Sequence, residues 1–134
     1  MVISRHKSNL ISFFCIYDFL VLQEIGYEFD IKHNIESLCK DDYENCDTHI
    51  KECVLMTIKN FDEIKSIITA NLVNWTYKRV SLINKAILFL SIAEYKYVGS
   101  IDKAIVIDNA VNFAKKYSDP DDYKFINGLL DKVL

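Results

Sequence analysis

The stretch SLINKAILFLSIAEYK at residues 81–96 decides the fold, because a helix built from it is apolar on almost every side. Such a helix has no face to offer to water, so it belongs at the centre of a bundle of helices. Gly99 and Ser100 come next and predict that this helix ends there and that Ser100 caps the following one. The rest of the chain must therefore supply the helices that surround residues 81–96.

Apolar residues recur at helical spacing on both sides of this central segment. Asn60 with Glu63 three residues on resembles a capping box, and Asp119 followed by Pro120 predicts the start of the last helix. Residues 31–40 form either a short helix or an irregular segment. The other helices are expected over residues 4–22, 41–58, 61–72, 81–96, 101–117 and 120–134, with a short connection around Trp75.

The composition favours this all-α interpretation. Of the 134 residues, 51% are hydrophobic and 26% are charged, and these values exclude an intrinsically disordered chain. One Pro and three Gly are too few for the many turns of an all-β protein. We therefore predict one all-α domain over residues 1–134, built as a compact bundle of six or seven helices.

The net charge of −3 by itself disfavours a nucleic-acid-binding protein, which usually has a basic surplus. The charge is uneven, however, because residues 1–58 carry a net charge of −5 and residues 59–134 a net charge of +2. Within the acidic half, Arg5 and Lys7 with His6 between them form a short basic start. The overall charge therefore does not exclude RNA as a ligand of the N-terminus.

The basic start and the apolar residues 10–22 superficially resemble a secretory signal. Asp18 interrupts the apolar run, no small-residue cleavage site follows it, and it is too short to span a bilayer. We therefore expect a first amphipathic helix and no membrane association. The four cysteines form no CxxC pair, which fits a reducing cytoplasm.

Cys46 and Cys53 are seven residues apart with His49 between them, so one helix would place all three on one face. Structural zinc usually takes four ligands from short paired motifs, and free cysteines are commonly buried. We therefore interpret the cysteines as core residues and expect neither a metal nor a cofactor. The common motifs of serine hydrolases, zinc proteases and phosphate-binding loops do not occur, so we expect no enzyme.

The last predicted helix carries KFINGLLDK at residues 124–132, where Gly128 is costly inside a helix and would mark a close approach of two helices. This segment resembles the KFVNGVLDK ending of the NusB family of transcription antitermination factors. INKAILFLSIAEY at residues 83–95 and IDNAVNFAK at residues 107–115 are similar to two further family segments. SFFCIY at residues 12–17 weakly resembles a fourth, and the segments come in the family's order.

The resemblance implies an all-helical fold of two packed subdomains and no catalysis. It also implies a cytoplasmic factor that binds boxA-like single-stranded RNA together with NusE, a ribosomal protein of the small subunit. The pair would act on the transcription elongation complex. The oligomeric state, including a homodimer, is left open.

By position in the family pattern, the resemblance implies two sets of binding residues and no catalytic or metal-binding residue. The basic start would meet RNA phosphates, and the aromatic residues would stack or pack beside them. The RNA-binding set is Arg5, His6, Lys7, Tyr17, Asp121 and Phe125, and the partner-binding set is Tyr17 and Asn84.

Several positions depart from the family pattern. Asn9 and Phe89 stand where the family has arginine, Phe14 replaces a glutamine, and Asn84 replaces an acid. Fewer positive charges release fewer counterions, so RNA binding should be weak alone and depend on a partner. Two alternatives follow: a NusB-fold interaction module that has lost RNA recognition, or the RNA-binding domain of an rRNA methyltransferase, which shares this fold.

Overall fold

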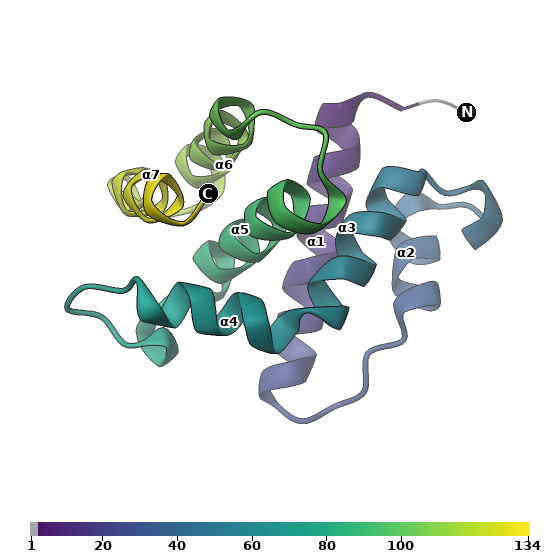
Figure 1. Ribbon diagram of the computed structural model, residues 1–134. Coiled ribbons are helices and arrows are strands. Elements are labelled where there is room, and N and C mark those ends of the chain that lie inside the picture. Colours follow the sequence, from purple (N-terminus) through teal and green to yellow (C-terminus); the bar gives the residue numbers. More distant parts are fainter. Residues whose placement is uncertain (1–2) are drawn as a thin grey trace.

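The computed structural model describes residues 3–134, and over that range it contains seven α-helices and no strand (Figure 1). The prediction of an all-α fold with six or seven helices is confirmed. Short turns of other helical types lie at Tyr43–Asn45, Tyr77–Arg79 and Glu94–Val98. The α-helices are α1 (Arg5–Glu24), α2 (Ile31–Cys39), α3 (Thr48–Lys59), α4 (Phe61–Ala70), α5 (Leu82–Ala93), α6 (Lys103–Tyr117) and α7 (Asp122–Val133).

Helix α5 is the central element, as its apolar sequence predicts. Every residue from Asn84 to Ala93 is buried, and the helix contacts α1, α3, α4, α6 and α7. The hydroxyl of Ser81 caps its start by accepting a hydrogen bond from the Asn84 amide at 3.1 Å. Gly99 ends the segment with φ at +82°, a left-handed conformation that glycine adopts at little cost.

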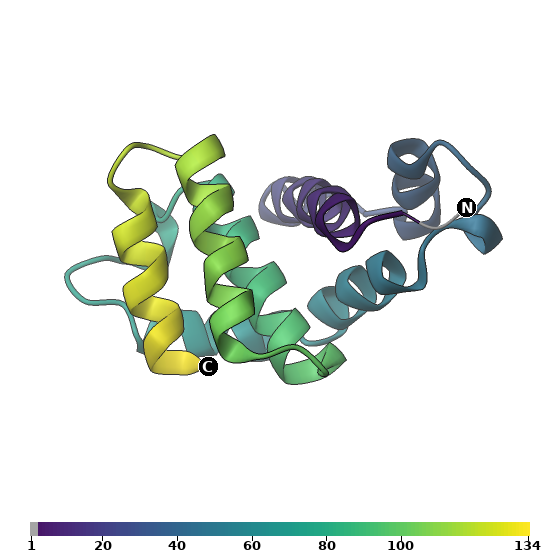
Figure 2. The same cartoon turned by 90° about the horizontal axis from the view of Figure 1, so that it is seen from above.

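Two groups of helices pack against α5, which confirms the expected pair of subdomains. Helices α1, α2 and α3 lie on one side, and α6 and α7 run side by side on the other (Figure 2). Helix α4 contacts α3, α5 and α7, so it connects the two groups.

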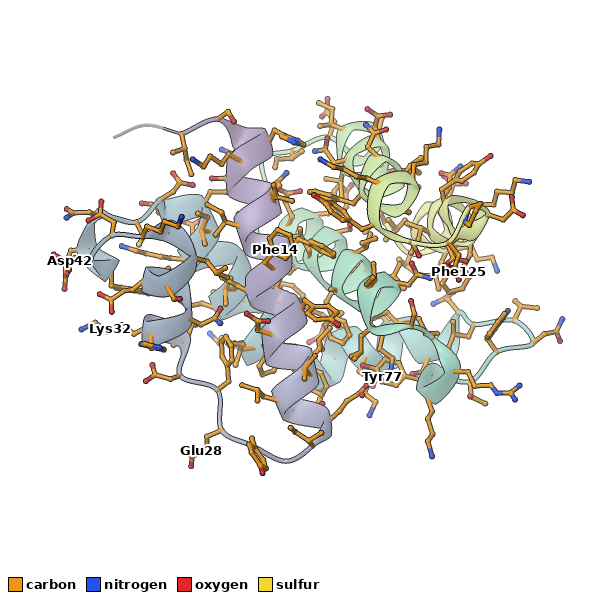
Figure 3. All side chains as sticks on the ribbon, turned by 180° about the vertical axis from the view of Figure 1, so that it is seen from behind. Phe14, Glu28, Lys32, Asp42, Tyr77 and Phe125 are labelled. Carbon is orange, nitrogen blue, oxygen red and sulfur yellow. The ribbon has the colours of Figure 1, made fainter. Side chains whose placement is uncertain are left out.

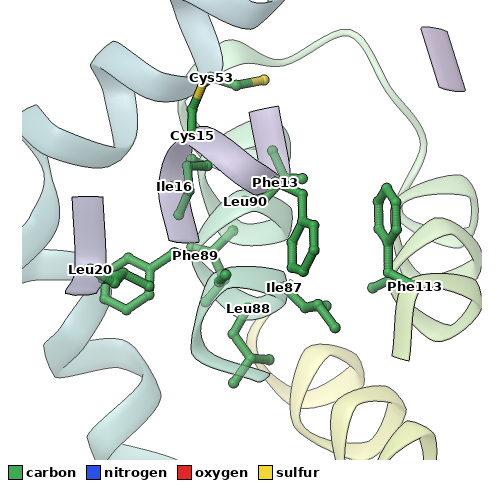
Figure 4. Close-up of a cluster of buried hydrophobic side chains, with 14 of the residues drawn as sticks. Phe13, Cys15, Ile16, Leu20, Cys53, Ile87, Leu88, Phe89, Leu90 and Phe113 are labelled. Carbon is green, nitrogen blue, oxygen red and sulfur yellow. The ribbon is translucent and has the colours of Figure 1, made fainter. Parts of the chain in front are cut away.

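Aromatic rings fill the space between α5 and its neighbours. Phe89, where the family pattern has an arginine, is fully buried and stacks on Phe61 of α4 with 5.3 Å between ring centroids. Phe61 in turn meets Phe19 of α1 edge-on at 5.7 Å. Figure 4 shows Phe89 among the apolar side chains of α1, including Ile16 and Leu20. The missing arginine charge is therefore replaced by core packing.

Lys85 is a buried cation on the central helix. Its side chain is 4% exposed, and Nζ lies 2.8 Å from Oε1 of Glu24 and 4.2 Å from the centre of the Tyr77 ring. A buried ammonium group is tolerated only when it is paired. The ion pair therefore fixes the last turn of α1 against the first turns of α5.

The segment before α3 differs from the prediction. The expected helix over residues 41–58 is wrong in its first part, because α3 begins at Thr48. Cys46 has extended backbone dihedrals, and the carboxylate of Asp47 accepts a hydrogen bond from the hydroxyl of Ser8 on α1. A tertiary contact thus holds Asp47 outside the helix. The segment 31–40, which the sequence left ambiguous, contains the regular helix α2 (Ile31–Cys39).

Two predicted helix caps are also wrong. The Asn60 side chain donates to the backbone carbonyl of Met56 at 3.0 Å, so it closes the end of α3 and does not cap α4. Ser100 has φ at +68°, and α6 begins only after Asp102. The Asn60 side chain therefore bonds the helix before it, and Ser100 lies in the turn that precedes α6.

Helix α7 begins at Asp122, two residues later than predicted, and no side chain in the described part of the chain caps it. Asp119 and Pro120 precede it, the Asp119 carbonyl accepts a hydrogen bond from the Asp122 amide at 3.0 Å, and a polar network holds the first residue of the helix. Asn84 of α5 donates to Oδ2 of Asp122 at 2.9 Å. The Ser118 hydroxyl lies 2.6 Å from the same oxygen and 2.8 Å from Oδ1 of Asn84, and its single proton can go to either. Hydrogen bonding from Ser118 and then from Asn84 holds the pKa of the Asp122 carboxyl below its ordinary value of 3.8.

Gly128 does not mark a close approach of helices, so that prediction is wrong. The residue is exposed, and no neighbouring atom lies within 4 Å of the place that a Cβ would take. Its φ lies outside the left-handed region.

Replacing Phe89 by alanine should lower the free energy of unfolding by about 3–5 kcal/mol, because it leaves a cavity beside Phe61 in the centre of the core. Urea unfolding measures the change. Ile105→Ala is the control, since Ile105 is 52% exposed on α6 and its truncation should change stability by less than about 0.5 kcal/mol. Equal losses in both variants would contradict a core organised around α5.

Asp122→Asn should reduce stability at neutral pH by about 1–2 kcal/mol, because neutral hydrogen bonds replace charge-assisted ones. The depressed pKa means that the carboxylate stabilises the fold above the pKa of the unfolded group. This contribution is lost as the pH falls through the lower native pKa. Unfolding measured from pH 7 down to about pH 3 should therefore show the difference shrinking in acid. Asp108→Asn, at an exposed residue of α6, should show no such convergence.

Gly128→Ala should stabilise the protein by about 0.5–1 kcal/mol, because alanine loses less backbone entropy in a helix and meets no neighbour here. Thermal unfolding should show a higher midpoint. A lower midpoint would mean that α7 approaches another surface at this point.

Candidate nucleic-acid interface

Arg5 opens α1, but its guanidinium is already engaged. Its Nη1 lies 3.0 Å from Nδ1 of His49 on α3. His49 is buried, and its Nε2 lies 2.8 Å from Oε2 of Glu94, which is only 2% exposed. Asn9, at a position where the family has arginine, completes the set with Oδ1 at 3.1 Å from the same nitrogen.

The His49 ring connects Arg5 to the end of α5. Nη1 of Arg5 lies 3.0 Å from Nδ1 and 3.4 Å from Nε2 of the ring, and Nε2 also faces Oε2 of Glu94 and Oδ1 of Asn9. A hydrogen-bonded chain therefore runs from the end of α5 through α3 to the start of α1. This chain orients Arg5 and at the same time reduces its availability for a phosphate.

His49, Cys53 and Glu94 also form a group whose potential metal-ligand atoms all lie within 4.8 Å of one another. Two features favour a hydrogen-bonded network at this place. The Arg5 guanidinium sits against the ring, and burial raises the pKa of the Cys53 thiol, so the thiolate that a metal needs is disfavoured. The predicted shared face of Cys46 and Cys53 is wrong, because Cys46 lies outside α3.

The three residues of the basic start face different neighbours. The His6 ring stacks on Phe113 of α6 at 6.3 Å between centroids. Lys7 lines a groove with Cys39 and Cys46 on the opposite flank of α1. Arg5 faces His49, so of the three only His6 lies between α1 and α6.

Aromatic side chains form a row between α1 and α6, which we call the aromatic strip. Phe113 and Phe13 stack at 5.4 Å, Phe13 and Tyr117 at 5.6 Å, and Tyr117 meets Phe14 edge-on at 6.1 Å. Phe13 and Phe113 are buried, whereas His6, Tyr117 and Phe14 reach the surface, and Phe14 is 38% exposed. The strip consists of His6, Phe113, Phe13, Tyr117 and Phe14.

Cations and amides border the aromatic strip. The Lys116 ammonium lies 5.4 Å from the centre of the Tyr117 ring, and Lys115 lies 4.8 Å from that of Tyr123 at the start of α7. A cleft of ≈ 120 Å³ opens beside His6 and is lined also by Asn109 and Asn112. Exposed rings beside lysines and amides can stack bases, attract phosphates and hydrogen-bond to base edges.

Two of the predicted binding residues, Asp121 and Phe125, lie at the start of α7. Asp121 is exposed and pairs with Lys124 at 3.6 Å. Phe125 is half-buried, lines a groove with Trp75, and appears on the same side of the molecule as Phe14 (Figure 3). Tyr17 packs at the margin of the core on α1. The fold therefore places Phe125 and the aromatic strip on a common side, and Tyr17 in the core margin.

Asn84, predicted to face a protein partner, is only 6% exposed. Its amide is held by Asp122 and Ser118, although its side chain also lines the groove beside Phe125. Its role in partner binding stays a prediction.

Residues that sequence reasoning did not select supply much of this surface. Phe14 departs from the family pattern, and Trp75 lies in a segment that the sequence predicts as a short connection. Lys116 and Phe113 lie on α6, and they come close to His6 only because α6 packs against this part of α1. Helical periodicity predicts which face of α6 is buried, but it does not predict which helix covers that face.

Comparison with known proteins identifies the chain's relatives. The model of the NusB family matches residues 7–134. The chain is 34% identical over 135 residues to the transcription antitermination protein NusB of Finegoldia magna, and the alignment covers 98% of this chain and 93% of that protein. It is 43% identical over 83 residues to NusB of Treponema denticola, a match that covers 62% of this chain and 61% of that protein.

Solved structures share the fold. NusB of T. maritima superposes with a TM-score of 0.83 at 24% identity, covering 99% of this chain and 92% of that one. A structure of the antitermination factors NusB and NusE in complex with dsRNA superposes with a TM-score of 0.79 at 23% identity, with coverages of 96% and 94%. Every helix within residues 3–134 is too short or too polar to traverse a bilayer. With the family model covering nearly the whole chain, the chain belongs to the NusB family.

Proposed function

We propose that this chain is a transcription antitermination factor that binds boxA-like single-stranded RNA together with a NusE-type ribosomal protein. The aromatic strip with Lys116 at its margin is the observation that carries the RNA part of the proposal. The names of the relatives support antitermination, and the fold shared with a NusB–NusE–RNA complex supports the pairing of RNA with a protein partner.

The chemistry of the strip suits single-stranded RNA better than a duplex. Exposed rings can stack unpaired bases, while lysines at the margin neutralise phosphates. With a net charge of −3 the chain repels RNA at long range, so a second protein that supplies contacts is part of the proposal. The proposed RNA-binding residues are Arg5, His6, Lys7, Tyr17, Asp121 and Phe125, and Lys116 at the margin of the strip joins them. Tyr17 and Asn84 are proposed to face the partner.

The role requires no catalysis and no cofactor, because binding alone holds RNA and partner on the elongation complex. We place it in the cytoplasm, where transcription and ribosomal proteins meet in a bacterial cell. One domain over residues 1–134 would carry all of these contacts.

A second candidate is a NusB-fold module that binds the protein partner but no longer recognises RNA. The engagement of Arg5 by His49 favours this alternative, because it removes one of two fixed positive charges from the basic start. The proposed and alternative functions differ in whether RNA adds to the stability of the complex with the partner.

Charge reversal at Lys7 and Lys116 should separate these functions. The wild type should bind boxA-like RNA more tightly with a NusE-type protein present, and more weakly at higher salt. The double variant Lys7→Glu, Lys116→Glu should lose at least tenfold in affinity and show a shallower salt dependence, because about two phosphate contacts disappear. Gel-shift titration at two salt concentrations measures both effects.

Lys32→Glu serves as the matched control, since Lys32 is an exposed lysine on α2, away from the aromatic strip. It should retain wild-type affinity, and circular dichroism should show equal helicity in all variants. A partner complex whose stability does not change when RNA is added would favour the module that has lost RNA recognition.

A further inference from the structure

The connection between α4 and α5 presents a large aromatic side chain to solvent. Trp75 is the only tryptophan of the chain, and it is 56% exposed. Val73 beside it is 62% exposed, and Asn74 between them has φ at +63°, so the connection turns sharply at this point. A single exposed apolar residue needs no explanation, but Trp75 also forms one wall of a groove.

The lining of the groove also includes Phe125 of α7, and its volume is ≈ 180 Å³. This is less than the roughly 300 Å³ at which pockets for drug-sized molecules begin, so it suits one flat ring system. The buried Val80 contributes to its lining, and Asn84 and Asp122 are held there by their own hydrogen bonds. The groove is therefore a slot whose lining includes two aromatic residues together with polar and apolar side chains that are already held in place.

The charges of the lining distinguish among possible occupants. Arg79, Asp119 and Asp122 all line the slot, so its positive and negative charges offset one another and a phosphate gains little inside it. Lys124 and Lys132 line the adjoining groove, where a phosphate would meet positive charge. A neutral ring attached to a negatively charged backbone fits this pattern, whereas a basic protein segment would meet the exposed Arg79, Lys124 and Lys132.

We propose that the slot between Trp75 and Phe125 holds one unpaired nucleobase of the bound RNA. The inference rests on the proposed function and extends its RNA surface from the α1–α6 face to the α4–α5 connection. Trp75 and Phe125 stack on the base, and Arg79 contacts the phosphate next to it.

The slot continues along α7, which gives the RNA chain a path away from it. A second groove of ≈ 210 Å³ shares Trp75 and Phe125 and extends past Val73, Gly128 and Lys132. The space beside Gly128 is open, since no atom lies within 4 Å of the place that a Cβ would take. The neighbouring nucleotide can therefore follow α7 toward Lys132.

The single tryptophan makes the test direct. Fluorescence of the wild type, alone and with a NusE-type protein, should be quenched when single-stranded boxA-like RNA is added, because a stacked base quenches the indole. Anisotropy of labelled RNA should show an affinity about fivefold to a hundredfold lower for Trp75→Ala, the loss typical of one stacked base. Trp75→Phe should restore most of the affinity. Trp75 is exposed, so folding should not be affected.

Tyr27→Ala is the matched control, since Tyr27 is 69% exposed in the connection after α1 and should not affect RNA binding. The slot would be refuted if RNA bound without quenching the fluorescence and if Trp75→Ala bound RNA as tightly as the wild type. The proposed RNA-binding function would then still hold. Quenching by the NusE-type protein alone would overturn it in favour of protein docking. A wild type that binds no RNA with or without the partner would refute the proposed RNA-binding function and the slot with it.

Discussion

Burial of α5 on all sides is the constraint on which the rest of the structure depends. A helix with ten consecutive buried residues can be stable only if other helices surround it. Five of the other six helices contact it, and α4 bridges the two groups that pack on its flanks. Phe89 obeys the same constraint. The family pattern has arginine at this position, and here the aromatic ring is buried in the core and stacks on Phe61.

The same constraint places polar chemistry at the two ends of α5. At its start, Asn84 joins Ser118 and Asp122 and so positions the beginning of α7 beside the slot of Trp75 and Phe125. At its end, Glu94 holds His49, which in turn holds Arg5 at the beginning of α1. Buried polar groups need such partners, and satisfying them ties the core to the proposed binding surface.

Much of the fold could be predicted because helical periodicity is a local signal. The central helix, α1, α6 and α7 follow from spacing, and Gly99 ends its segment for a local backbone reason. Helix boundaries were less predictable where a tertiary contact competes with a local one. Asp47 bonds to Ser8 and stays outside α3, and Asn60 closes α3 where local pattern assigned it to α4. The candidate site was less predictable still, since Arg5, His6 and Lys7 are adjacent in sequence but face three different neighbours.

The sequence by itself determined the helical class, the central position of residues 81–96 and the resemblance to the NusB family, because composition, period and motif are properties of the chain alone. Only the tertiary structure decided which side chains meet. It stacked Phe113 of α6 on His6 of α1 with Lys116 lining the same cleft, and it placed Trp75 and Phe125 in the lining of one groove. The physical reason is that periodicity fixes which face of a helix is buried, whereas packing between helices selects the partner of that face.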